Sequence, residues 1–155
     1  MIIRAFDPAE TADVDGLLQS AFGQPDEAEL VGALRADGHI ALELVADHKK
    51  KVVGYVALSR MQAPSGWLAM APVCTAKKMR NQGIASALCQ MALQYANAPV
   101  VVLGEPKFYT HAGFDFKRAA RLTSPFPIEF TGLYAPEIEA HQPAEALVYA
   151  APFMG

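Results

Sequence analysis

The chain has 155 residues, of which 52% are apolar, and its formal net charge is −3. This size and apolar content suit one domain with its own core, which we expect to span residues 1–155. The acidic balance argues against general nucleic-acid binding. The N-terminus lacks the basic start of a signal peptide, and no apolar run reaches the length of a membrane span. We therefore expect a cytoplasmic protein with no nucleic-acid or membrane partner.

The cysteines and histidines show no metal-ligand spacing. Cys74 and Cys89 stand fifteen positions apart, which fits neither a metal pair nor a disulfide framework. The histidines are His39, His48, His111 and His141. They are scattered, so we expect reduced thiols and no metal.

The first third of the chain predicts a strand followed by two helices. Residues 1–6 are expected to form the strand, and Asp7 with Glu10 forms a capping box that starts a helix at Pro8. Helical spacing predicts a buried stripe on this helix. Its members are Val14, Leu17, Leu18, Ala21 and Phe22. After a break at 23–25, residues 27–36 predict a second helix that buries Leu30, Val31 and Leu34.

Alternating apolar residues then predict an antiparallel hairpin. Residues 40–46 and 52–58 flank a polar turn that contains three lysines, which we interpret as solvated. The next strand is expected over residues 67–75. Pro72 cannot donate to a sheet ladder, so the sheet should loosen there.

The second half begins with the clearest helical pattern of the chain. Residues 81–97 predict a helix, and its buried stripe is expected to be Ile84, Ala87, Leu88, Met91, Ala92 and Tyr95. Residues 100–103 form a fully apolar run, which is typical of a parallel strand covered on both faces. A short helix at 108–112 and strands at 114–116 and 147–149 are expected to follow. The proline-rich segment 121–143 has no clear assignment.

The turn between the strand and the long helix has the properties of an anion site. Gly83 lets backbone approach a ligand, and small Ala85 keeps the wall low. The helix start offers free N–H groups and a favourable dipole. Lys77, Lys78 and Arg80 add local positive charge to an acidic protein.

These residues also carry a family resemblance. Residues 80–85, Arg-Asn-Gln-Gly-Ile-Ala, match the pattern Gln/Arg-x-x-Gly-x-Gly/Ala. Residues 108–114, Phe-Tyr-Thr-His-Ala-Gly-Phe, are similar to a Phe-Tyr-x-x-x-Gly-Phe signature that follows about 25 residues later in the same family. Together with residues 71–73 and 101–106, they resemble the YhbS-like bacterial subgroup of GNAT acetyltransferases.

The resemblance implies an α/β GNAT acyl-CoA N-acyltransferase fold. This fold is a mixed, mostly antiparallel sheet with splayed central parallel strands and helices on both faces. It also implies that acetyl-CoA binds as cosubstrate, with its pyrophosphate at the glycine turn and its pantetheine arm along the strand end. The cofactor-binding residues expected from it are Val73, Cys74, Thr75, Arg80, Asn81, Gln82, Gly83, Ile84, Ala85 and Ser86.

The expected reaction is acetyl transfer to an amine by direct attack in a ternary complex. Tyr109 is expected to protonate the departing thiolate, and an amide near Cys74 to polarise the thioester. Glu105 is the best-placed base in the sequence. Glu27, Glu29 or a water chain are the alternatives. Cys74 as a nucleophile is disfavoured, because no histidine stands at a suggestive spacing.

This chain departs from the family pattern after the strand at residues 100–103. Many family members carry an asparagine after the strand that ends near Leu103, where this chain has Gly104-Glu105-Pro106, so a contact to the pantetheine arm or to a water can differ. A non-catalytic acyl-CoA sensor or partner module of the same fold is the alternative function. The sequence identifies neither the acceptor, which is a small-molecule or peptide amine, nor the acyl preference, and it leaves open whether the protein forms a homodimer.

Overall fold

A six-stranded sheet in the order β1-β2-β3-β4-β5-β6 forms the centre of the protein. The computed structural model describes residues 1–136 and 143–155. The strands are β1 (Ile2–Ala5), β2 (Ile40–His48), β3 (Lys51–Arg60), β4 (Leu68–Thr75), β5 (Val100–Leu103) and β6 (Thr131–Tyr134). Four neighbouring pairs are antiparallel, and only β4 and β5 run parallel. The expected mixed, mostly antiparallel sheet is therefore confirmed.

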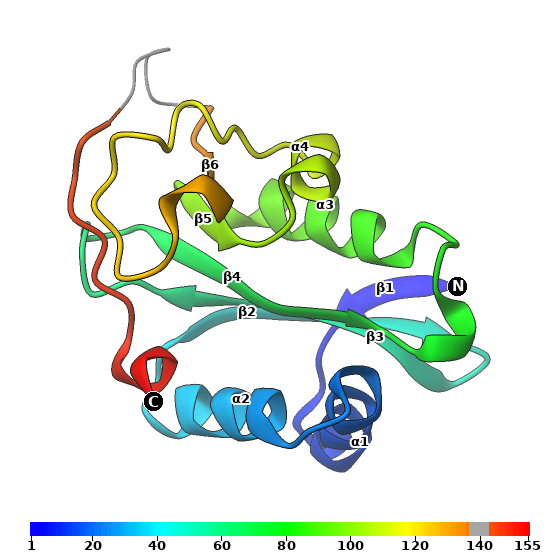
Figure 1. The fold of residues 1–155 in the computed structure, drawn as a ribbon. Coiled ribbons are helices and arrows are strands. Elements are labelled where there is room, and N and C mark those ends of the chain that lie inside the picture. The colour runs from blue at the N-terminus through cyan, green and yellow to red at the C-terminus, as the bar shows by residue number, and fades with distance from the viewer. Residues whose placement is uncertain (137–142) are drawn as a thin grey trace.

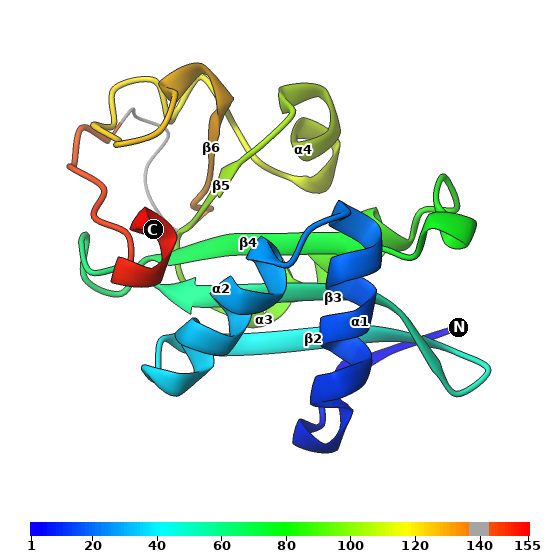
Figure 2. The ribbon, with the colours of Figure 1, turned by 60° about the horizontal axis from the view of Figure 1, so that its bottom comes forward.

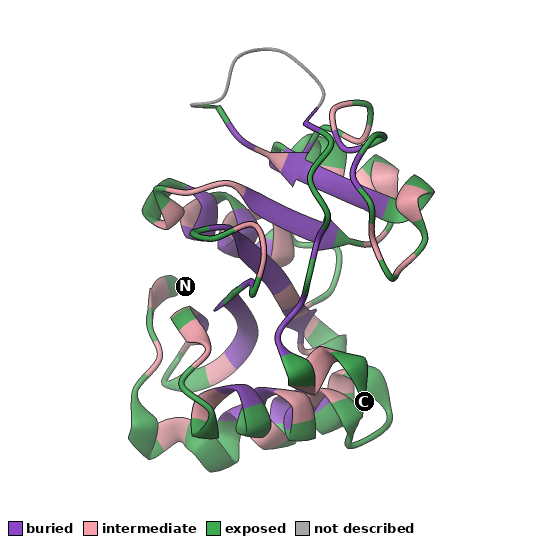
Figure 3. Cartoon of the chain, turned by 90° about the vertical axis from the view of Figure 1, so that its left-hand side faces the viewer, coloured by how far each residue is buried: buried purple, intermediate pink, exposed green. Residues whose placement is uncertain are grey.

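Helices cover both faces of this sheet (Figures 1 and 2). The α-helices are α1 (Thr11–Phe22), α2 (Asp26–Ala36), α3 (Ile84–Ala96) and α4 (Pro106–Ala112), and short 3-10 turns occur at Pro8–Glu10, Lys77–Met79, Ile128–Phe130 and Ala151–Met154. One core lies between α1, α2 and the sheet, and a second lies under α3. Figure 3 shows how buried residues concentrate in the strands. Among the described residues, no helix is both long and apolar enough to cross a membrane.

The buried side of α3 differs from the predicted stripe. Ile84, Leu88 and Ala92 are buried as expected, but Tyr95 is 66% exposed. Cys89 and Leu93 are buried in its place. The physical reason is that α3 packs against α4 as well as the sheet, which rotates the buried stripe away from Tyr95. The helix also begins at Ile84, three residues later than predicted.

Two predicted strands near the C-terminus were wrong. Residues 114–116 contribute only an isolated bridge from Asp115 to Leu133, because Gly113 adopts a φ of 119° and Asp115 then accepts a hydrogen bond from the Arg118 N–H in a turn. Residues 147–149 likewise form only a bridge between Val148 and Ala63, a loop residue. The sixth strand is instead β6, inside the segment that the sequence left unassigned.

A partly buried polar network holds α2 on the sheet. The Glu43 carboxylate of β2 accepts hydrogen bonds from Arg35 at 2.7 Å and from the Tyr55 hydroxyl at 2.5 Å. The Arg35 guanidinium also stands 4.3 Å from the centre of the Phe6 ring. Burial and the Glu43 carboxylate raise the pKa of Tyr55, which therefore stays a neutral donor. The C-terminal end of α2 is fixed relative to β2 and β3 by these contacts.

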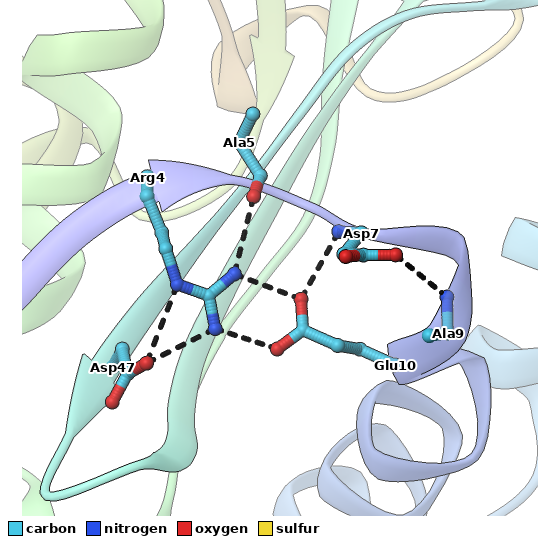
Figure 4. A network of polar contacts seen from close by, with 6 residues as sticks. All are labelled: Arg4, Ala5, Asp7, Ala9, Glu10 and Asp47. Carbon is cyan, nitrogen blue, oxygen red and sulfur yellow. Dashed lines mark hydrogen bonds and ion pairs between the residues drawn. The ribbon is translucent and has the colours of Figure 1, made fainter.

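The capping box predicted at Asp7 is present and belongs to a larger network (Figure 4). The Glu10 carboxylate accepts from the Asp7 N–H at 3.0 Å and from Arg4 at 2.6 Å. Arg4 also donates to Asp47 at 3.0 Å, which ties β1 to the end of β2. The hydrogen bond from Arg4 lowers the pKa of Glu10.

We expect Glu10→Gln to lower the unfolding free energy at pH 7 by about 0.5–1 kcal/mol. Because the folded-state pKa of Glu10 is depressed, its contribution is present above the unfolded value of 4.5 and is lost as the pH falls through the folded value. The difference from the wild type should therefore shrink in acid. Urea unfolding between pH 7 and pH 3 checks this, with the exposed Glu145→Gln as control. A constant difference over that range would contradict it.

Candidate active site

The site begins where β4 and β5 separate. The parallel pairing covers Leu68–Met70 and Val100–Val102 and stops there. Beyond Pro72, β4 continues to Thr75 while it pairs only with β3 on its other side. Residues 73–75 therefore keep one backbone edge toward the gap. The predicted loosening of the sheet at Pro72 is confirmed.

A tight loop leads from this strand end into α3. It includes the 3-10 turn Lys77–Met79, and both Asn81 and Gly83 have positive φ, at 63° and 80°. Gly83 stands at the N-cap position, and no side chain caps the helix. The first N–H groups of an α-helix have no partner within the helix. The helix therefore presents uncapped donors beside the strand end.

A cavity of about 340 Å³ joins the strand end, this loop, the end of α1 and the start of α4. Ten of the predicted residues line it: Val73, Cys74, Thr75, Arg80, Asn81, Gly83, Ile84, Ala85, Ser86 and Tyr109. Gln82 and Glu105 were also predicted, but they lie outside the lining. Cys74 packs with the α1 and α2 core, whereas Val73 packs on the α3 side. The cavity thus passes through the gap in the sheet.

Four lining residues were missed from the sequence. They are Ala21, Phe22, Met79 and Phe108. Phe22 was assigned to the buried stripe of α1, but it is 40% exposed and borders the cavity. Its place at the last turn of α1, just before the Gly23 cap, is the only sequence signal that could have separated it from the stripe.

Arg80 connects the loop to α1. Its guanidinium donates to the Ala21 carbonyl at 2.9 Å, at the C-terminal end of the helix, where a positive charge is favourable. The side chain of Arg80 is otherwise exposed, as are Lys77 and Lys78. Of these three basic residues, only Arg80 lines the cavity, and Lys77 and Lys78 add exposed positive charge to the same loop.

Thr75 contributes an unused polar group to the lining. Its residue is 9% exposed, and its hydroxyl has no hydrogen-bond partner. A buried hydroxyl without a partner is costly unless a ligand or water satisfies it. Thr75 therefore places a buried hydroxyl without a described partner in a residue that lines the cavity.

Tyr109 enters the cavity from α4 between aromatic neighbours. Its ring makes edge contacts with Phe108, at 4.9 Å between centres, and with Phe114, at 5.8 Å. Burial raises the pKa of Tyr109, and the nearby Cys89 adds to the increase. The phenol is therefore protonated at every ordinary assay pH and can act as a proton donor.

The two cysteines are buried thiols. Burial raises the pKa of both Cys74 and Cys89 to about 12. At Cys74 the Arg80 charge opposes this shift and the Glu27 carboxylate reinforces it. A thiol with such a pKa is almost fully protonated at neutral pH, which disfavours Cys74 as a nucleophile.

The candidate carboxylates differ in their relation to the cavity. Glu105 is exposed at the N-cap position of α4, where its side chain makes no capping hydrogen bond, and Glu29 is exposed on α2. Glu27 is half-buried, and its charge acts on Cys74 in the cavity wall. Glu27 also lines a second cavity of about 600 Å³ between α2 and the C-terminal residues Pro152–Gly155.

Within residues 1–136 and 143–155, no group of three histidine, cysteine or acidic residues could hold a metal ion. His39, His48 and His111 fall within these ranges, and His141 lies outside the described residues. The donor set of the cavity, with uncapped amides, Thr75 and Tyr109, fits an anionic organic ligand.

Comparisons with known proteins agree with this geometry. The Acetyltransferase (GNAT) family model matches residues 11–120. The uncharacterized N-acetyltransferase YhbS of Escherichia coli strain K12 is 39% identical over 123 residues, which cover 74% of each chain. The crystal structure of that YhbS in complex with CoA superposes with a TM-score of 0.90 at 31% identity, covering 99% of this chain and 92% of that one.

A second solved structure extends the comparison. A GNAT family acetyltransferase from Brucella melitensis, in complex with acetyl-CoA, gives a TM-score of 0.83 at 26% identity and covers 98% of this chain and 97% of that one. The family match spans strands β2 to β5 and all four α-helices, and the similarity to YhbS extends over nearly the whole fold. On these grounds, the chain belongs to the GNAT acetyltransferase family.

Proposed function

We propose that this protein transfers an acetyl group from acetyl-CoA to an amine by direct attack in a ternary complex. The observation that carries the proposal is the cavity that joins the uncapped start of α3 to the Tyr109 phenol through the β4–β5 gap. The structures of the YhbS and Brucella melitensis relatives hold CoA and acetyl-CoA, which supports the same cosubstrate here.

The loop and the first turn of α3 would hold the pyrophosphate. Asn81 and Gly83 line the cavity with backbone in the left-handed region, and Ala85 and Ser86 follow in the first helical turn. Backbone amides and the helix dipole favour negative charge there. Gln82 lies outside the lining, so its predicted role is confined to the backbone of the turn.

The free edge of β4 would bind the pantetheine arm. Residues 73–75 face the gap, and the unpartnered Thr75 hydroxyl lies in the same wall. An amide near Cys74 would polarise the thioester oxygen and stabilise the negative charge that develops on it. The amine nitrogen then forms a bond to the carbonyl carbon.

Tyr109 would complete the reaction as the general acid. When the carbon–sulfur bond breaks, the electron pair stays on sulfur and the phenol donates its proton there. Burial keeps this phenol protonated. Because the Cys74 thiol is also protonated, a covalent acyl-cysteine step is disfavoured, which supports direct attack.

The amine must lose a proton, and Glu27 is the carboxylate that the structure supports best for that task. A lysine-like amine is neutral only about one part in 2,500 at pH 7, a deficit of roughly 4.6 kcal/mol. Neither carboxylate lines the cavity, but Glu27 is half-buried and its charge acts on Cys74 in the cavity wall, whereas Glu105 is exposed. A water chain from the cavity to solvent is the other route.

We expect Glu27→Gln to lower kcat/KM for the amine about 100-fold at pH 7. The loss should diminish as the pH rises, because more of the amine is then already deprotonated. The pH profile of kcat/KM measures this. Glu105→Gln, made in parallel, tests the competing assignment: a loss in that variant with normal activity in Glu27→Gln would transfer the role to Glu105.

A screen of thiol release from acetyl-CoA tests the proposed function. The panel covers simple amines, aminoglycosides, amino acids and peptides, and the protein should release thiol with at least one of them. An acyl-CoA sensor or partner module would bind acetyl-CoA without releasing thiol. We place the reaction in the cytoplasm, because both cysteines are free thiols.

A further inference from the structure

Gly104 follows β5 directly and lies against the ring of Tyr109. A Cβ atom built on Gly104 would stand 2.3 Å from Cε2 and 2.9 Å from Cδ2 of that ring. Carbon atoms normally approach no closer than about 3.5 Å. The φ of Gly104 lies outside the left-handed region, so backbone conformation does not require a glycine. Instead, the position of the Tyr109 ring requires a glycine at residue 104.

Hydrogen bonds hold the backbone on both sides of this contact. The Gly104 N–H donates to the Phe130 carbonyl at 2.9 Å, which ties the strand end to the segment before β6. The Tyr109 backbone is bonded in both directions, to Glu105 at 3.1 Å and to Phe114 at 3.0 Å. Edge contacts with Phe108 and Phe114 enclose the ring. A methyl group at Gly104 must therefore displace the ring rather than the backbone.

We propose that Gly104 is a positioning residue, whose missing side chain sets where the Tyr109 hydroxyl stands in the cavity. This inference rests on the proposed function, in which that hydroxyl protonates the leaving sulfur. Proton transfer requires that the donor lie within hydrogen-bond reach of its acceptor. If the Tyr109 ring is displaced, its hydroxyl can no longer protonate the leaving sulfur, although the phenol is still present. The cofactor-binding loop belongs to other elements and keeps its own structure.

Kinetics of the full-length protein with the acceptor found in the screen test this role. We expect Gly104→Ala to lower kcat about tenfold or more, with KM for acetyl-CoA within about threefold of the wild type. In a Tyr109→Phe background, Gly104→Ala should cause no further loss, because both changes remove the same interaction. Gly16→Ala serves as the control, since a Cβ at Gly16 meets nothing within 4 Å.

A spectroscopic measurement tests the contact between Gly104 and the Tyr109 ring independently of acetyl transfer. With fluorotyrosine incorporated, the fluorine signal assigned to Tyr109 through the Tyr109→Phe variant should shift in Gly104→Ala and stay in place in Gly16→Ala. An unshifted signal, an unchanged kcat, or a loss that persists in the Tyr109→Phe background would overturn the inference. If the wild type releases no thiol with any amine, the proposed function fails, whereas a shifted signal would still establish that Gly104 sets the ring position.

Discussion

Replacing Gly83 by aspartate should abolish acetyl-CoA binding. Gly83 has a φ of 80°, and a Cβ there would point into open space at the cavity lining. The new carboxylate would stand where the pyrophosphate is expected, and close like charges cost several kcal/mol, so we expect an affinity loss of about 100-fold or more. Isothermal titration calorimetry measures it.

Gly83→Asn is the matched control for that variant. Asparagine has nearly the same size as aspartate and tolerates the left-handed region, but it is neutral. We expect it to weaken binding by no more than about tenfold, which corresponds to 1.4 kcal/mol. If both variants lost the same acetyl-CoA affinity, the cause would be backbone strain rather than charge. Unchanged affinity in Gly83→Asp would refute the pyrophosphate assignment.

Tyr109→Phe should lower kcat by about 100-fold or more, because it removes the general acid. Acetyl-CoA affinity should stay within about threefold, since phenylalanine keeps the ring contacts with Phe108 and Phe114. Steady-state kinetics and calorimetry on the same preparation separate the two effects. Tyr95→Phe, on an exposed side chain of α3, is the control.

The pH dependence follows from the raised pKa of Tyr109. The phenol stays protonated above its usual value near 10, so its ionisation should cause no loss of wild-type turnover up to pH 10. The acidic limb should instead report deprotonation of the amine or its base. Wild-type turnover of Tyr109→Phe at every pH would remove Tyr109 from the mechanism.

The elements at the centre of the fold could be predicted from short stretches of sequence. Gly83 and the apolar spacing of α3 predicted a strand, a tight loop and a helix, and Pro72 predicted the point where β4 leaves its neighbour. These features depend on backbone conformation and hydrophobic period, both of which can be read within a few residues. Most of the cofactor-binding residues that the family resemblance implies line the cavity, and their contacts to the cofactor stay a prediction.

The features that could not be predicted from the sequence depend on contacts between distant segments of the chain. β6 pairs with β5, from which about thirty residues of chain separate it. No local pattern in the proline-rich segment that contains β6 predicts this pairing. The exposure of Phe22 and Tyr95 depends on how α1 meets the loop and how α3 meets α4. Glu105 is close to the site in the sequence but is exposed, whereas Glu27 is half-buried and its charge acts on Cys74 in the cavity wall. Neither residue lines the cavity.

The most direct test of acetyl transfer in this cavity is a paired assay of thiol release and acetylated amine with wild-type protein, Gly83→Asn and Gly83→Asp. The proposal predicts equimolar thiol and acetylated product from the wild type, retained turnover in Gly83→Asn, and neither product from Gly83→Asp. Tight acetyl-CoA binding by the wild type with no thiol release across the whole amine panel would contradict it.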